Sequence, residues 1–194
     1  MAQEFRQMTA QEIDYWYTNE LSEAFAENER KPLPDIMQLM AQGRYEIWGL
    51  FEAEHMLGYA CLWKSPDIPL VLLDYLGVSA RLRNGGLGST VLSHLKSLGM
   101  PVVTESELPV DGDTPEENDL RRRRIGFYQR NGFIPAYEMA TCGMPWQALL
   151  VNADAVPLST VMRWHKELYG AERADVKVPI GSNEVAPLPY WMEK

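Results

Sequence analysis

The chain contains few of the residues that build disulfides and metal sites, with two cysteines and three histidines in 194 residues. Cys61 and Cys142 lie in apolar surroundings and not at CxxC spacing, so we expect reduced, buried thiols and a reducing compartment. His55, His94 and His165 are scattered along the sequence. We therefore expect none of them to be catalytic and no metal to be bound, because no set of ligands at metal-binding spacing can be assembled.

Long hydrophobic runs are also missing. No apolar stretch approaches the roughly 18 residues that a membrane span requires, and no secretory leader opens the chain. We therefore expect a soluble, cytoplasmic protein with no membrane partner. The formal net charge of −9 argues against non-specific binding to nucleic acid and mildly favours small cationic partners.

Helix and strand patterns alternate along most of the chain, and two capping boxes, at Thr9–Glu12 and Thr114–Glu117, mark helix starts. The patterns predict helices at 9–25, 33–43, 87–98, 114–131 and 159–170, and strands at 45–52, 57–64, 69–79, 101–107, 132–142 and 144–152.

These elements predict an α/β fold, a mixed and mostly antiparallel sheet of six or seven strands with helices on both faces. We expect the sheet to splay between the strands that begin near Val71 and Pro101. Residues 1–152 are predicted to form the main domain. Residues 153–194 are predicted to be a C-terminal helix and an irregular tail, docked on the domain or on a second subunit.

The most distinctive stretch is "RLRNGGLGST", residues 81–90, which joins a predicted strand to a predicted helix. A strand, a glycine turn and a helix together direct backbone N–H groups and the positive end of a helix dipole at a phosphate. The GxxxxGK[ST] loop is excluded because no lysine follows, and GxGxxG fails because Val91 replaces the last glycine. The pattern R-x-x-G-x-G fits at Arg83, Gly86 and Gly88. A turn that merely caps the helix is the alternative.

Together with the later "FYQRNGF", this turn resembles the GNAT superfamily of acetyl-CoA-dependent N-acetyltransferases, over roughly residues 40–150. The resemblance implies the acyl-CoA N-acyltransferase fold, acetyl-CoA as co-substrate and, by family habit, a homodimer. It also implies that Tyr128 faces the thioester sulfur. The implied coenzyme A contacts, including backbone groups that Gly77 could free from the sheet, are Leu76, Gly77, Val78, Arg83, Asn84, Gly85, Gly86, Leu87, Gly88, Ser89 and Tyr128.

One position departs from the family pattern. Many relatives carry an asparagine seven positions before the tyrosine, where this chain has Arg121. Either Arg121 takes over that cofactor contact or the cofactor arm lies differently. The run 121–124 is four arginines, and successive helical residues point in different directions, so they cannot all serve one site. We expect one or two of them at the 3′-phosphate of coenzyme A, and the others on a solvated face.

Acetyl transfer to an amine needs a neutral amine, a stabilised oxyanion and a protonated leaving thiolate. Asp74, Glu105 and Glu107 are the candidate bases, and the alternative for each is a purely structural carboxylate. Tyr128 is the candidate acid, because a thiol with a pKa of about 8.5 and a phenol with a pKa of about 10 are nearly matched. A core aromatic next to Phe127 is the alternative for Tyr128.

The acceptor is predicted to be the amine of a small molecule, attacked directly in a ternary complex. The first helix carries Tyr15, Trp16 and Tyr17 near several glutamates, which either hold an organic cation or form an ordinary amphipathic helix. The alternatives are a protein or peptide N-acetyltransferase, a non-catalytic acyl-CoA-binding or regulatory module, and a nucleotide-binding protein that uses the glycine turn for another phosphate.

Overall fold

The structure is a computed structural model that describes residues 2–27, 30–82 and 85–189. Seven strands form one mixed, mostly antiparallel sheet in the order β1-β2-β3-β4-β5-β7-β6. This confirms the predicted α/β class, and the strand count is the upper of the two expected. Two compact units divide the chain: unit 1 is 1–67 with 73–99, and unit 2 is 68–72 with 100–194.

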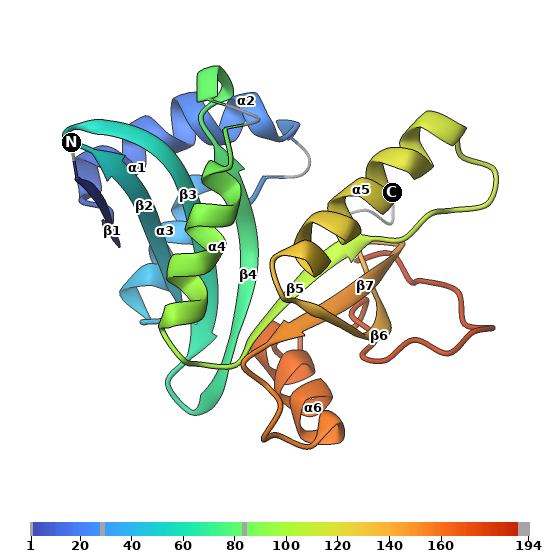
Figure 1. The fold of residues 1–194 in the computed structure, drawn as a ribbon. Helices are drawn as coiled ribbons and strands as arrows, with labels where there is room; N and C mark the ends of the chain where they lie inside the picture. Colours follow the sequence, from blue (N-terminus) through green and yellow to red (C-terminus); the bar gives the residue numbers. More distant parts are fainter. Residues whose placement is uncertain (1, 28–29, 83–84, 190–194) are drawn as a thin grey trace. The chain divides into compact units, whose positions relative to one another are not determined.

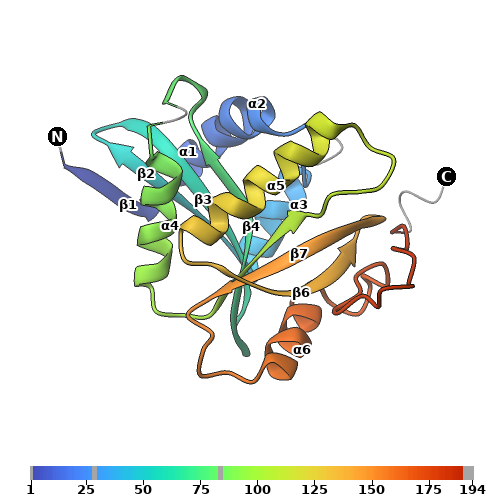
Figure 2. The ribbon, with the colours of Figure 1, turned by 45° about the vertical axis from the view of Figure 1, so that its right-hand side comes forward.

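Unit 1 contains the N-terminal strands and the helices that cover them. The strands are β1 (Gln3–Gln7), β2 (Tyr45–Glu52), β3 (His55–Ser65) and the second half of β4 (Ile68–Val78). The helices are α1 (Ala10–Tyr15), the π-helical turn Trp16–Leu21, α2 (Ser22–Ala24), α3 (Leu33–Ala41), the short 3₁₀ turn Ala80–Leu82 and α4 (Leu87–Ser97). In Figures 1 and 2, α4 runs along one face of these strands and α1 to α3 cover the other.

The first helix begins where the sequence predicts. Thr9 accepts from the backbone N–H of Glu12, and the Glu12 carboxylate accepts from the backbone N–H of Thr9, so the capping box is confirmed. The predicted single helix is divided by the π-helical turn, within which Trp16 and Leu21 are fully buried. β1 was missed because its five residues, QEFRQ, are mostly polar and show no apolar alternation.

Unit 2 holds the remaining elements: the first half of β4, β5 (Val102–Glu107), α5 (Pro115–Arg130), β6 (Ile134–Thr141), β7 (Met144–Val151) and α6 (Leu158–Tyr169). β7 pairs antiparallel with both β5 and β6. Thr104 of β5 is hydrogen-bonded to Tyr128 of α5, whereas Glu105 is bonded to His165 of α6. Because neighbouring strand residues point to opposite faces, α5 and α6 cover opposite faces of these strands.

The tail after α6 lies against unit 2. Residues Ala140 and Lys177 exchange two backbone hydrogen bonds, and Ile180 N–H donates to the Glu138 carbonyl. The Lys166 ammonium of α6 donates to two tail carbonyls, at 2.6 and 2.8 Å. Since β6 is the last strand of the sheet, the tail covers backbone groups that would otherwise be exposed at the edge. The domain boundary at 152 stays a prediction.

Within unit 2 the start of β4 is tied to the start of β5, because Val71 N–H donates to the Pro101 carbonyl at 3.0 Å. The splay expected beyond this point concerns the relation of the two units and stays a prediction. Among the described residues, no helix has the length and hydropathy that crossing a membrane requires.

Candidate functional site

The last residues of the predicted glycine turn form the N-terminus of α4. Gly86 is the N-cap of α4, with φ +79° and ψ −1°, in the left-handed region that favours glycine. It offers no side chain to the first turn of the helix, so the N–H groups there have no side-chain cap. Together with the helix dipole, these N–H groups form a position suited to an anion.

The other predicted turn residues lie around this N-terminus. Gly85 and Gly86 are exposed, and Leu87, Gly88 and Ser89 are half-buried in the first turn of the helix. Thr90 N–H donates to the Gly86 carbonyl at 3.1 Å, which is the first hydrogen bond of the helix. Arg83 and Asn84, the remaining predicted turn contacts, lie outside the described residues.

Near the end of β4, Gly77 is required by packing. A Cβ atom at Gly77 would lie 2.2 Å from ring atom Cζ of Tyr59, a separation that no real side chain tolerates. From the sequence, Gly77 was expected to free neighbouring backbone groups from the sheet, and this stays a prediction. The structure shows a steric reason for a glycine at this position. Leu76 and Val78, on either side, are half-buried.

The three candidate bases are each held by partners. In unit 1, the Lys31 ammonium donates to both Asp74 oxygens, at 2.8 and 2.7 Å, and the Tyr45 hydroxyl donates to the same carboxylate at 2.5 Å. Burial, with the Asp74 charge next in importance, raises the pKa of Tyr45, which keeps this hydroxyl protonated as a donor. Asp74 is therefore one half of an enclosed ion pair.

Glu105 belongs to a chain of four side chains in unit 2. Its carboxylate lies 2.9 Å from His165 Nε2 and accepts from the Tyr169 hydroxyl at 2.8 Å. The Tyr137 hydroxyl lies 2.9 Å from His165 Nδ1. Because an ionised carboxylate only accepts, Nε2 carries the proton, and in a neutral imidazole Nδ1 accepts from Tyr137. Burial raises the pKa of Tyr137, with the Glu105 charge adding to the shift.

Glu107 is paired with Arg121, the residue that replaces the family's asparagine. Arg121 Nε donates to Glu107 at 3.1 Å, and Nη1 donates to Asp113 at 2.5 Å and to Asn118 at 3.0 Å. The hydrogen bonds to Asp113 and then to Glu107 raise the pKa of Arg121. Its guanidinium thus joins α5 to neighbouring segments of unit 2 through these hydrogen bonds. This favours the alternative in which Arg121 does not take over the asparagine's cofactor contact and the cofactor arm lies differently.

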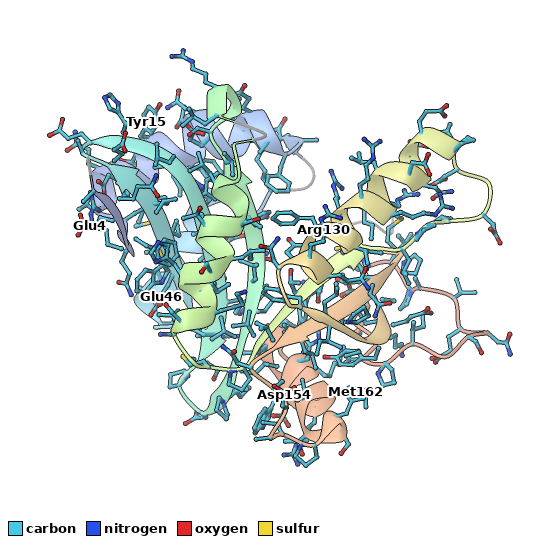
Figure 3. All side chains as sticks on the ribbon, in the orientation of Figure 1. Glu4, Tyr15, Glu46, Arg130, Asp154 and Met162 are labelled. Atoms are coloured by element: carbon cyan, nitrogen blue, oxygen red, sulfur yellow. The ribbon has the colours of Figure 1, made fainter. Side chains whose placement is uncertain are left out.

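The remaining arginines of α5, Arg122, Arg123, Arg124 and Arg130, are exposed, and a contact of one or two of them with the 3′-phosphate of coenzyme A stays a prediction. Arg122 is paired with Asp119 at 2.7 Å. Together with Arg123 and Arg130 (labelled in Figure 3), these two residues line an open hollow of about 370 Å³. The lack of a Cβ at Gly126 leaves room for the Arg130 guanidinium, whose Nη1 would lie 3.2 Å from such an atom.

Tyr128 is half-buried on α5, with the Phe127 and Phe133 rings in edge contact at centroid distances of 5.4 and 5.7 Å. Burial raises its pKa, which outweighs the opposing effects of the hydrogen bond with Thr104 and of the Arg124 charge. The phenol is therefore neutral near pH 7, the form that a proton donor needs.

The contact between His165 and Glu105 was not predicted. The two residues are 60 positions apart, so no local pattern in the sequence joins them. His94 stacks on Phe5 in unit 1, with ring centroids 5.2 Å apart. In the described part of the chain, no three His, Cys, Asp or Glu side chains are grouped as a metal site would require.

The strand order and the β4–α4 turn together define an α/β protein with a candidate anion site at a helix N-terminus. Comparison with solved structures shows which α/β proteins have a similar fold. A candidate GNAT-family acetyltransferase of Bacteroides thetaiotaomicron matches with a TM-score of 0.64 and 24% identity, over 86% of this chain and 98% of that one. A GNAT acetyltransferase of Elizabethkingia anophelis with acetyl-CoA bound matches with a TM-score of 0.53 and 12% identity, over 77% and 97%.

The sequence comparison agrees with the structural one. YjbC of Bacillus subtilis (strain 168), named as a candidate acetyltransferase, is 32% identical over 118 residues. These residues make up 61% of this chain and 56% of that protein, so the match spans little more than half the length of the curated relative. No family model matches the sequence. The chain has the fold of these solved GNAT acetyltransferases, and membership of the family stays a prediction from its two motifs.

Proposed function

We propose that the chain is an acetyl-CoA-dependent N-acetyltransferase acting on the amine of a small molecule by direct attack in a ternary complex. The observation that carries this proposal is the β4–α4 connection, with left-handed Gly86 at an uncapped helix N-terminus, in a fold whose Elizabethkingia anophelis relative holds acetyl-CoA. The net charge of −9 supports a cationic acceptor over a phosphorylated or nucleic-acid one.

Acetyl-CoA supplies the acetyl thioester, and the chain supplies binding, orientation and a proton. The backbone N–H groups of residues 87–89 would hold the pyrophosphate, as an anion at a helix N-terminus. Backbone groups of 76–78 would hold the thioester oxygen and the pantetheine arm. In the transfer, the nitrogen of the neutral amine forms a bond to the acetyl carbon, the carbon–sulfur bond breaks, and the leaving sulfur takes a proton from the Tyr128 hydroxyl. The acylated nitrogen releases one proton as the amide forms, and the Tyr128 oxygen takes up a proton from solvent, so the protons balance.

No carboxylate is assigned the role of base in this proposal. Asp74, Glu105 and Glu107 are hydrogen-bonded to Lys31, His165 and Arg121 respectively, and these partners occupy carboxylate lone pairs that a base would offer to the amine. The amine would then lose its proton to water before attack. We expect turnover at subsaturating amine to rise about tenfold per pH unit below the pKa of the amine, since the neutral fraction rises at that rate.

A calorimetric titration with acetyl-CoA, set beside ATP and NAD, tests the cofactor. Two glycines offer a matched pair of variants, because Gly86 and Gly99 lie at opposite ends of α4 with φ of +79° and +73°, and a Cβ at either meets nothing within 4 Å. Gly86→Asp and Gly99→Asp thus introduce similar backbone strain and the same charge. Only Gly86→Asp should weaken acetyl-CoA binding, by at least tenfold. Equal losses in both variants, or no binding by the unaltered chain, would count against the proposed site.

A non-catalytic acyl-CoA-binding module is the second candidate, favoured by the pairing of all three candidate bases. Release of free thiol from acetyl-CoA in the presence of a panel of small amines separates the two. Tight binding of acetyl-CoA without amine-dependent thiol release across pH 7 to 10 would favour the binding module.

A further inference from the structure

The ammonium group of Lys31 is enclosed by one carboxylate and two aromatic rings in unit 1. Its Nζ atom lies 2.8 and 2.7 Å from the two Asp74 oxygens, 4.8 Å from the centroid of the Trp63 ring and 5.1 Å from that of Tyr75. The Tyr45 hydroxyl donates to Oδ2 of the same carboxylate. The three neighbouring strands β2, β3 and β4 therefore all contribute to this ammonium cage, defined as Tyr45, Trp63, Asp74 and Tyr75.

The chemistry of the ammonium cage is that of a receptor for a primary ammonium ion. A carboxylate provides charge-assisted hydrogen bonds, and aromatic faces attract the cation through their quadrupoles. The Asp74 side chain is 13% exposed and that of Lys31 is 24% exposed, so the pair is largely but not completely removed from water. Truncation of the Lys31 side chain would leave the position of its ammonium to a free amine.

The backbone of Lys31 is anchored independently of its side chain. Its N–H donates to the Tyr75 hydroxyl at 3.0 Å, and its carbonyl accepts from the Tyr17 hydroxyl at 3.0 Å. Both bonds survive any substitution of the side chain other than proline. Truncating Lys31 should thus leave the segment in place and the ammonium cage empty.

We propose that the ammonium cage is a binding site for a primary alkylammonium ligand, and that Lys31 is a tethered occupant which such a ligand can replace. The cage lies close to the proposed acyl-transfer site along the chain, because Asp74 precedes Leu76 by two residues of β4, about 7 Å of strand. If that proposed function holds, the ligand is the second ammonium group of a diamine acceptor. Alkylammonium binding itself does not depend on acyl transfer.

The test uses the full chain with Lys31→Ala and the probe n-propylammonium chloride, which replaces the three methylene groups and the ammonium that the substitution removes. Calorimetry should give a millimolar dissociation constant for the variant, at least tenfold tighter than for the unaltered chain, in which Lys31 competes. The melting temperature of the variant should rise by about 3 °C at ten times the dissociation constant. Tetramethylammonium chloride at equal concentration controls for ionic strength and should have no such effect.

Two further variants assign the binding to the cage. Lys31→Met fills the space with an uncharged chain of similar length and should not bind propylammonium. The double variant Lys31→Ala/Asp74→Asn keeps the space left by the lysine side chain but removes the carboxylate charge. It should bind propylammonium at least tenfold more weakly than Lys31→Ala alone. If Lys31→Ala does not fold in buffer, refolding in propylammonium but not in tetramethylammonium supports the proposal, and failure in both overturns it. A folded Lys31→Ala protein that does not distinguish the two cations also overturns it.

A separate experiment tests whether the ammonium cage recognises a diamine acceptor. With acetyl-CoA present, Lys31→Ala should release thiol at least tenfold faster with 1,4-butanediamine than with n-butylamine. Equal rates would remove the cage from acceptor recognition and leave propylammonium binding intact. The propylammonium titration contains no acetyl-CoA. Failure of the diamine experiment therefore does not contradict alkylammonium binding, and failure of the titration does not contradict acetyl transfer.

Discussion

The substitution Glu105→Gln tests whether Glu105 is a structural carboxylate or the catalytic base. The carboxylate receives two donors, the Nε2–H of His165 and the Tyr169 hydroxyl, in a position where His165 is fully buried and the Glu105 side chain is 12% exposed. Both donors reach Oε1, so a glutamine with its carbonyl oxygen there keeps two neutral hydrogen bonds. A hydrogen bond to a charged group contributes about 1 kcal/mol more than a neutral one. We therefore expect Glu105→Gln to lower the free energy of unfolding by about 2 kcal/mol.

The assay is urea unfolding followed by tryptophan fluorescence, with a melting temperature as a second measure. A loss of about 2 kcal/mol corresponds to a decrease of about 4–8 °C for a chain of this size. Glu138→Gln is the matched control, because Glu138 is an exposed glutamate of unit 2 and its loss should change stability by less than about 0.5 kcal/mol. Thiol release by Glu105→Gln should stay within tenfold of the unaltered protein. Unchanged stability with a loss of thiol release above a hundredfold would refute the structural role and identify Glu105 as the base.

The other predictions concern a proton donor, a surface ion pair and the thiols. Tyr128→Phe should lower thiol release by about 10²- to 10⁴-fold with acetyl-CoA binding nearly intact, and unchanged turnover would remove this hydroxyl from the reaction. The hydrogen bond from Arg6 lowers the pKa of Glu12 to about 2 from an ordinary 4.5, so its stabilisation is present above pH 4.5 and is lost as the pH falls toward 2. Because the pair is partly exposed, we expect a difference in unfolding free energy of about 1 kcal/mol between Glu12→Gln and the unaltered protein at pH 7, which shrinks below pH 4.5 and disappears below pH 2; a difference independent of pH would contradict this. Burial raises the pKa of the Cys61 thiol, so a thiol reagent should label half-buried Cys142 first and Cys61 only on unfolding, and equal rates in the native state would contradict its burial.

Local sequence rules predicted most of the elements correctly. Both capping boxes occur at the predicted residues, because a threonine and a glutamate three positions apart satisfy each other's neighbouring backbone groups without help from the rest of the fold. Gly86 adopts the left-handed conformation at the start of α4, and Gly99 adopts it just after the end of that helix. Such positions are predictable because their causes lie within one turn of helix.

The partners of the candidate bases were not predictable in the same way. Asp74 and Lys31 are 43 residues apart, and Glu105 and His165 are 60 residues apart. A sequence shows that a carboxylate lies on a strand, but not which distant side chain neutralises it. Arg121 is a second example. Helical periodicity predicted that it lies on α5, but its ion pairs with Asp113 and Glu107 depend on the tertiary fold.

The sequence by itself thus determined the order of the main helices and strands and the glycine at the start of α4, since short-range hydrogen bonding and side-chain periodicity specify both. The resemblance to the GNAT family came from two short motifs of the sequence. Tertiary structure alone decided the pairing of each buried charge, the ammonium cage around Lys31 and the need for glycine at position 77 beneath the Tyr59 ring. These features arise where strands distant in sequence become neighbours. There, the cost of removing a charge or a ring from water is offset only by groups that the chain brings together on folding.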